Sequence, residues 1–215
     1  MRIAILTFDG FNEIDSLVSL HILNRMRPNG WRAEIVGPTH TVTSMNGVVL
    51  HTQAPLESAR TADVVLFGSG IGGREASSDP CQRERVVLDP EVQLVGAQCS
   101  GTLMMARLGL LDGLPACTDL QTKPWVIEAG LDVLDRPFVA HGNRATAGGC
   151  LSSTYLSAWV IASLAGREQA GDVLRAVAPV GESTFVDHAL SVIEPFLGPP
   201  ESTVAYQTEK TNARG

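Results

Sequence analysis

Cys99 is the residue of this 215-residue sequence that is best placed for covalent chemistry. It follows an apolar run at residues 92–98 and precedes a segment of helical spacing that extends from Ser100 to Arg107. A residue between a buried strand and a helix start lies where backbone N–H groups and the helix dipole stabilise an anion. We therefore expect Cys99 to have a lowered pKa and to act as a nucleophile. The alternative is a buried thiol that only fills space at the end of a strand.

A carboxyl group is expected beside this thiol. Asp15 follows the first apolar run and lies at or near the start of the first helix, and Asp9 and Glu13 compete with it in the same loop. A protonated carboxyl group could donate a hydrogen bond to a thiolate, whereas an ionised one would repel it, so the two groups should titrate as a coupled pair. A helix cap is the structural alternative for Asp15.

The sequence GSGIGG at residues 68–73 is a glycine-rich loop that follows another apolar run. It lacks the GxGxxG spacing of dinucleotide-binding loops. Its N–H groups could instead face Cys99 and form an oxyanion hole. A tight turn that needs glycine dihedral angles is the simpler alternative. Gly101, two residues after Cys99, is expected to let the chain turn tightly.

The other titratable residues indicate neither a catalytic base nor a metal site. None of the five histidines follows Cys99 directly, so the sequence does not call for a Cys-His hydrolase. The four cysteines form no CxxC pair, and no histidine stands at a metal-ligand spacing from them. We therefore expect no bound metal, and in a reducing compartment no structural disulfide.

These residues need a scaffold that brings three loops together. Apolar runs alternate with segments of helical spacing, which predicts a mostly parallel sheet with helices on both faces. In such a sheet, sites form at the carboxyl ends of strands. Each of the loops at 9–15, 68–73 and 99–101 begins at such an end. The predicted strands are 2–8, 31–37, 63–67, 92–98, 132–139 and 143–147, with a hairpin at 41–52. The predicted helices are 14–27, 100–107, 152–165, 168–176 and 184–196, with a polar helix after Pro80.

Composition and charge set the broad class of the protein. The chain is 44% hydrophobic and 18% charged, which is ordinary for a globular protein, and its net charge of −7 argues against nucleic acid as the main partner. The N-terminal apolar run is too short for a signal-peptide core or a membrane span, so we expect a cytoplasmic protein. We expect one α/β domain over residues 1–197 and a polar tail over 198–215.

Four stretches resemble a known family: IAILTFDGFNEID, DVVLFGSGIGG, GAQCSGTLMMARLGLLDG and GNRATAGG. In this order and spacing they are similar to the ThiJ/PfpI superfamily, and the resemblance covers residues 1–197. It implies the class I glutamine-amidotransferase-like fold, a flavodoxin-like single-domain sandwich with the cysteine at a nucleophile elbow. Within the superfamily the pattern is most similar to that of isonitrile hydratases.

The resemblance implies roles for individual residues. The family's nucleophile corresponds to Cys99 and its catalytic aspartate to Asp15, while Ser100 stands where the family has a contributing threonine. The residues that it implies for oxyanion and substrate binding are Gly68, Ser69, Gly70 and Gly101. Members are commonly homodimers that need no cofactor, so we expect a homodimer that binds a small-molecule substrate.

The chain departs from the family pattern at three places around the expected pocket. Ser16 follows Asp15 where the family usually has a turn with Gly-Pro, and Gly68-Ser69 replaces a pair of glycines. The usual Thr-His-Trp is Thr118-Asp119-Leu120. These changes bear on the substrate rather than on the fold.

The resulting prediction is a hydro-lyase that hydrates an isonitrile to an N-substituted formamide through Cys99. Three alternatives remain open. One is a related cysteine enzyme, a glyoxalase or deglycase that acts on reactive aldehydes. Another is a non-enzymatic redox sensor in which Cys99 oxidises to sulfinic acid. The third is a ligand-binding domain, like the regulators that join this fold to a helix-turn-helix module.

Overall fold

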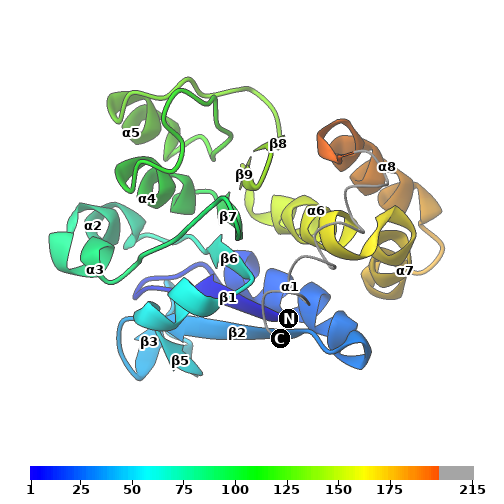
Figure 1. Cartoon of the computed structure of the whole chain (residues 1–215), viewed down its shortest axis with the longest axis horizontal. Coiled ribbons are helices and arrows are strands. Elements are labelled where there is room, and N and C mark those ends of the chain that lie inside the picture. Colours follow the sequence, from blue (N-terminus) through cyan, green and yellow to red (C-terminus); the bar gives the residue numbers. More distant parts are fainter. Residues whose placement is uncertain (199–215) are drawn as a thin grey trace.

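The computed structural model describes residues 1–198 and is built on a seven-stranded sheet (Figure 1). All neighbouring strands in this sheet are parallel except β8 and β9. The strand order is β5 (Ala54–Pro55), β2 (Arg32–Gly37), β1 (Arg2–Leu6), β6 (Val64–Phe67), β7 (Leu94–Gln98), β9 (Arg144–Ala147), β8 (Phe138–His141). The predicted hairpin is confirmed as β3 (Thr41–Thr43) paired with β4 (Val49–His51).

Helices cover both faces of the sheet, as Figure 1 shows. One face carries α1 (Glu13–Leu23), α6 (Ser153–Ala165), α7 (Arg167–Val177) and α8 (Ser183–Ile193). The other carries α2 (Gly73–Ser78), α3 (Pro80–Glu84), α4 (Gly101–Arg107) and α5 (Lys123–Glu128). Short 3-10 turns complete the chain: η1 (Asn24–Asn29), η2 (Leu56–Thr61), η3 (Cys150–Ser152) and η4 (Glu194–Phe196). The predicted α/β sandwich is therefore confirmed.

The alternation of side chains along the central strands produces two cores. On β1, Ile3 and Ile5 face the layer of α1 and α6, while Ala4 and Leu6 face the layer of α4. Every residue of β7 is buried, as expected for a parallel strand covered on both faces. The largest fully buried side chain is Trp159 of α6. These cores hold the carboxyl ends of β1, β6, β7 and β9 rigidly at one edge.

The structure corrects several element boundaries. The strand predicted at 132–139 is found instead at Phe138–His141, because Pro137 has no N–H to donate to a ladder. Upstream of it, Val133 makes only an isolated bridge to Ala116. Helices α2 and α5 and the two-residue strand β5 were not predicted, because these short segments carry little periodic signal.

The predicted polar tail, residues 198–215, lies outside the described residues apart from Gly198. The domain boundary at residue 197 therefore stays a prediction. Within residues 1–198, no helix combines the length and the hydropathy needed to cross a bilayer.

Candidate active site

Cys99 occupies a strained turn between β7 and α4. It is the one non-glycine residue within 1–198 whose φ is positive, at 46°. Such a conformation costs about 1–3 kcal/mol and is typical of nucleophile elbows. The backbone around it is held firmly, because Cys99 N–H donates to the carbonyl of Ala147 at 2.9 Å and its own carbonyl accepts from Thr118 Oγ1 at 2.8 Å. The predicted elbow is thus present, with the thiol only 4% exposed.

Asp15 reaches the thiol from the first turn of α1, whereas its two competitors do not. Asn12 caps α1 by accepting from Ile14 N–H, so Asp15 is free of the capping role. Asp9 accepts from the N–H of Thr43, and Glu13 accepts from the hydroxyl of Ser44, so both hold the hairpin. The structure therefore selects Asp15, 2% exposed, as the carboxyl group of the site.

The carboxyl group of Asp15 is only partly satisfied. Its Oδ2 accepts a short hydrogen bond from the Ser69 hydroxyl, while its Oδ1 is buried without a hydrogen-bond partner among the described residues. Burial raises the pKa of Asp15 above its usual range, and the negative charge of Asp119 adds to this. The Ser69 hydrogen bond and the thiols of Cys150 and Cys99 act in the opposite direction. Asp15 therefore takes up its proton at a higher pH than an exposed aspartate does.

The expectation of a lowered pKa for Cys99 is wrong. Burial raises the pKa of the Cys99 thiol far above its usual value, and the negative charges of Asp15 and Asp119 raise it further. The start of α4 does not compensate, because the thiol is shielded from water and faces carboxyl groups. The thiolate and the Asp15 carboxylate disfavour each other, so the pair holds one proton between them and titrates as a coupled unit.

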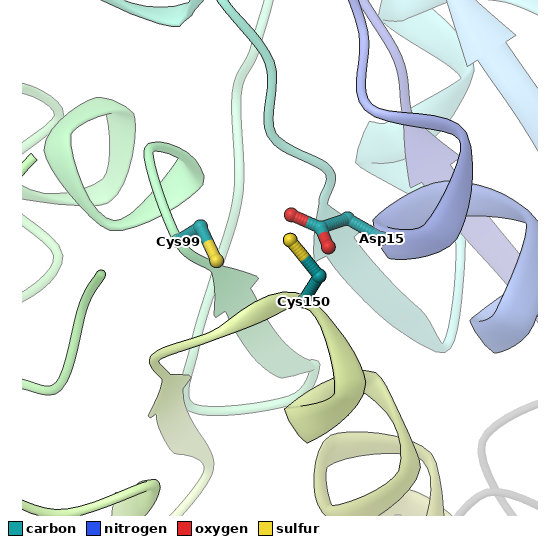
Figure 2. A group of neighbouring side chains, drawn as sticks. All are labelled: Asp15, Cys99 and Cys150. Carbon is teal, nitrogen blue, oxygen red and sulfur yellow. The ribbon is translucent and has the colours of Figure 1, made fainter. Parts of the chain in front are cut away.

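Cys150 completes a cluster that the sequence did not predict. Its sulfur, the Cys99 sulfur and an Asp15 oxygen all lie within 4.8 Å of one another, and the three side chains point toward a common centre (Figure 2). Asn12 Nδ2 donates to Cys150 Sγ at 3.1 Å. The sequence AGGC could have indicated Cys150, because it begins at the last residue of β9. This strand ends at the same edge of the sheet as β7, which precedes Cys99. A soft metal ion fits such a spacing, so the expected absence of a metal stays a prediction.

The glycine-rich loop and Ser100 are tied to each other. Gly70 N–H donates to Ser100 Oγ at 3.0 Å, and that hydroxyl donates to the Gly70 carbonyl at 3.1 Å. In this conformation the Gly70 N–H already has Ser100 Oγ as its acceptor, and its role in an oxyanion hole stays a prediction. Ser100 here links the elbow to the glycine-rich loop. The hydroxyl that donates to the Asp15 carboxyl group is that of Ser69.

The glycines of the site are required by close approaches of the backbone. A side chain at Gly70 would meet the carbonyl oxygen of Gly10 at 2.1 Å. A side chain at Gly101 would meet the carbonyl oxygens of Phe67 and Gly68 at 2.6 and 2.7 Å. Gly101 does not have a positive φ, so it serves close packing rather than a tight turn. At Gly68 the obstacle is the Ser16 hydroxyl, at 2.5 Å.

The cluster lies at the base of a pocket of about 980 Å³. Cys99, Ser69 and Cys150 line its floor, and apolar side chains of Ile71, Leu120 and other residues line its walls. Ile71 and Leu120 are largely exposed around it. No histidine lines this pocket in the described part of the chain. The site can therefore hold a small molecule with an apolar group while its reacting end meets the Cys99 thiol. Asp15 does not itself line the pocket but lies within 4.8 Å of that thiol.

A family model for the DJ-1/PfpI family matches residues 1–162, which include Cys99, Asp15 and Cys150. The chain belongs to this family. The predicted ThiJ/PfpI membership is thus confirmed. A comparison with curated protein sequences finds no match.

Solved DJ-1/PfpI structures share the fold at low sequence identity. A ThiJ/PfpI family protein from Pseudomonas syringae is 20% identical with a TM-score of 0.73, covering 95% of this chain and 89% of that one. DJ-1 from Schizosaccharomyces pombe is 18% identical with a TM-score of 0.60, covering 89% and 99%. Oxidized DJ-1 from Toxoplasma gondii is 16% identical with a TM-score of 0.67, covering 82% and 97%. At these identities the likeness extends to the fold alone.

Proposed function

We propose that this DJ-1/PfpI protein is a cofactor-independent hydro-lyase that converts an isonitrile to an N-substituted formamide. The observation that carries the proposal is the Cys99 thiol on a strained elbow within 4.8 Å of the buried Asp15 carboxyl group. A nucleophile and a proton carrier at this distance are what the reaction needs. The likeness to isonitrile hydratases in sequence pattern supports this substrate class.

The first step adds the thiol across the terminal carbon of the isonitrile. Cys99 sulfur forms a bond to that carbon, and the thiol proton passes through Asp15 to the same carbon. The product is a thioimidate, in which carbon is bonded to sulfur, hydrogen and nitrogen. Because the Cys99–Asp15 pair holds one proton between them, the transfer creates no second negative charge in the buried site.

The second step hydrolyses the thioimidate. Asp15, now ionised, takes a proton from water as the water oxygen attacks the thioimidate carbon. The nitrogen receives a proton, the carbon–sulfur bond breaks, and the thiol is restored. The balance is one isonitrile and one water in, and one N-substituted formamide out.

The pocket supports a substrate with an apolar substituent. The isonitrile end is small and weakly polar, so it can reach a thiol that is 4% exposed. The substituent would lie against the Ile71 and Leu120 side of the pocket. Such contacts contribute through buried apolar area, at about 25 cal/mol per Å².

The test is incubation of the purified protein with cyclohexyl isocyanide, with formamide followed by mass spectrometry. We expect formamide, and a loss of at least about a thousandfold on Cys99→Ala, because the covalent step disappears. Cys117→Ala, which removes a buried thiol outside the cluster, should retain turnover. A loss of less than tenfold on Cys99→Ala would overturn the mechanism.

The alternatives give different products from the same protein. Lactate formed from methylglyoxal without glutathione, with no formamide from any isonitrile, would replace the proposal by an aldehyde-directed enzyme. Turnover of neither substrate would favour a sensor or ligand-binding protein.

Homodimer formation is a further proposal, which light scattering of the purified protein tests.

A further inference from the structure

Cys150 has no part in the proposed reaction, although it lies in the same cluster. Its sulfur is within 4.8 Å of the Cys99 sulfur, and a disulfide needs about 2.05 Å, so closure requires a movement of less than about 3 Å. The other cysteines lie elsewhere: Cys81 is exposed on α3, and Cys117 is buried. Within residues 1–198, this arrangement sets Cys150 apart as a thiol placed to react with Cys99.

The chain around Cys150 is hydrogen-bonded to the elbow and forms only a short turn. Gln98, which precedes Cys99, donates from Nε2 to the carbonyls of Gly149 and Cys150 at 2.6 and 3.4 Å. Cys150 begins the short turn η3 and is partly exposed, unlike Cys99. Gly149 before it has a φ of 88°, a left-handed conformation that glycine adopts without steric cost. The hydrogen bonds bring the two thiols together, and the short turn allows the final approach.

We propose that Cys99 and Cys150 form a reversible disulfide after Cys99 is oxidised by a hydroperoxide, so that Cys150 is the resolving thiol of a two-cysteine redox site. The proposal does not depend on the isonitrile reaction. It assigns to this chain a chemistry that ends in a disulfide rather than in irreversible sulfinic acid.

The oxidation proceeds in two balanced steps. In the first, Cys99 sulfur forms a bond to the distal peroxide oxygen and the O–O bond breaks. The thiol proton passes through Asp15 to the departing oxygen, which leaves as an alcohol or water, and Cys99 becomes a sulfenic acid. In the second, Cys150 sulfur attacks the Cys99 sulfur, the S–O bond breaks, and the Cys150 proton leaves with the hydroxyl as water. An external dithiol returns both thiols.

The cluster favours the second step over further oxidation. Further oxidation needs a second peroxide molecule to enter the pocket, whereas the Cys150 thiol is already beside Cys99. The Cys150 sulfur lies within 4.8 Å of the Cys99 sulfur, and intramolecular reactions between positioned groups have large effective concentrations. Asp15 lies beside both sulfurs and can carry the proton that the hydroxyl needs.

The sequence allows a sharp test by peptide mapping. The four cysteines lie on four different tryptic peptides: residues 75–83, 86–107, 108–144 and 145–167. The protein is treated with equimolar hydrogen peroxide, blocked with iodoacetamide, digested without reductant and analysed by mass spectrometry. We expect the peptide with Cys99 to be linked to the peptide with Cys150, with the loss of two hydrogen atoms.

Variants distinguish resolution from simple oxidation. In Cys150→Ser the link cannot form, so a pulse with at least two equivalents of hydrogen peroxide, one for each oxygen atom gained, should convert Cys99 to sulfinic acid. After a peroxide pulse, dithiothreitol should restore at least about tenfold more alkylatable Cys99 in the parent protein than in Cys150→Ser. Cys117→Ser and Cys81→Ser should form the link as the parent does. Circular dichroism of each variant confirms that it is folded.

Two outcomes would overturn the proposal. One is sulfinic acid on Cys99 at equal rates in the parent and in folded Cys150→Ser. The other is a link from Cys99 to Cys81 or Cys117 in place of Cys150. Because the readout is the covalent state of Cys99, formamide production can fail while the disulfide forms, and the reverse.

Discussion

The Asp15 carboxyl group and the Cys99 thiol lie within 4.8 Å of each other. The charge of Asp15 raises the pKa of Cys99, whereas the Cys99 thiol lowers the pKa of Asp15 by hydrogen bonding. Asp15 comes from the first turn of α1 and Cys99 from the end of β7, so the pair joins segments 84 positions apart. One buried unit with one shared proton accounts for both proposed reactions. It also makes the behaviour of the site depend on pH.

Asp15→Asn should stabilise the protein at neutral pH while abolishing turnover. Burial raises the pKa of Asp15 above its ordinary 3.8, so the stability that this group contributes is present below that value and lost as pH rises through the folded pKa. Removing the charge should therefore raise the free energy of unfolding by about 1–3 kcal/mol near pH 7.5. The gain should shrink as pH falls toward 4.

Urea unfolding of the parent and Asp15→Asn at several pH values measures this effect. Asp187→Asn is the matched control, because Asp187 is an exposed aspartate on α8. An Asp15→Asn variant that is less stable than the parent at pH 7.5 would show that the carboxylate is better satisfied than the structure indicates.

Asp119→Asn should make Cys99 more reactive at neutral pH. The negative charge of Asp119 raises the pKa of Cys99 and of Asp15. Its Oδ1 accepts from the N–H groups of Gln121 and Thr122, and asparagine keeps that acceptor, so the loop should not move. Each unit by which the pKa of Cys99 falls should increase the thiolate fraction about tenfold.

The rate of iodoacetamide alkylation of Cys99 against pH tests this prediction. The curve for Asp119→Asn should lie at lower pH than that of the parent. Asp135→Asn changes another aspartate of the same pocket and is the control. Coincident curves for Asp119→Asn and the parent would contradict the assigned electrostatic cause.

Ser100→Ala should loosen the contact between the elbow and the glycine-rich loop. The variant loses a hydroxyl that both accepts from and donates to the backbone of Gly70. The Gly70 N–H then has no acceptor, while the Gly70 carbonyl keeps its hydrogen bond from Gly73 N–H, so we expect a loss of about 1–3 kcal/mol in unfolding free energy. Thermal unfolding measures it, and Ser191→Ala, at an exposed position of α8, should change stability far less.

Gly70→Ala should be strongly destabilising. Its Cβ would lie 2.1 Å from the Gly10 carbonyl oxygen and 2.5 Å from Phe11 Cα, which are backbone atoms that cannot rotate away. We expect a cost of at least about 1–3 kcal/mol, with loss of the pocket floor. Gly171→Ala on α7 meets only flexible side-chain atoms at 3.3 Å or more, so it should be neutral or stabilising. Comparable melting temperatures for the two variants would contradict this account.

Much of the fold and part of the site could be predicted from the sequence. Buried strands such as β1 and β7 are short apolar runs, and α6 and α8 carry helical spacing, so the alternation of elements was readable. The convergence of Asp15, Ser69 and Cys99 followed, because parallel strands end at one edge. Short elements such as α5 were missed, since six residues carry too little periodic signal.

What the sequence by itself determined is the family, the sheet and the position of Cys99 on its elbow, because these follow from local pattern and chain order. Only the tertiary structure decided that Asp15, rather than Asp9 or Glu13, faces the thiol, since the hairpin binds the other two. It also brought in Cys150 and reversed the expected direction of the Cys99 pKa. The burial of a group and its distances to charged neighbours set its pKa, and both depend on how the whole chain folds. A local stretch of sequence therefore does not determine them.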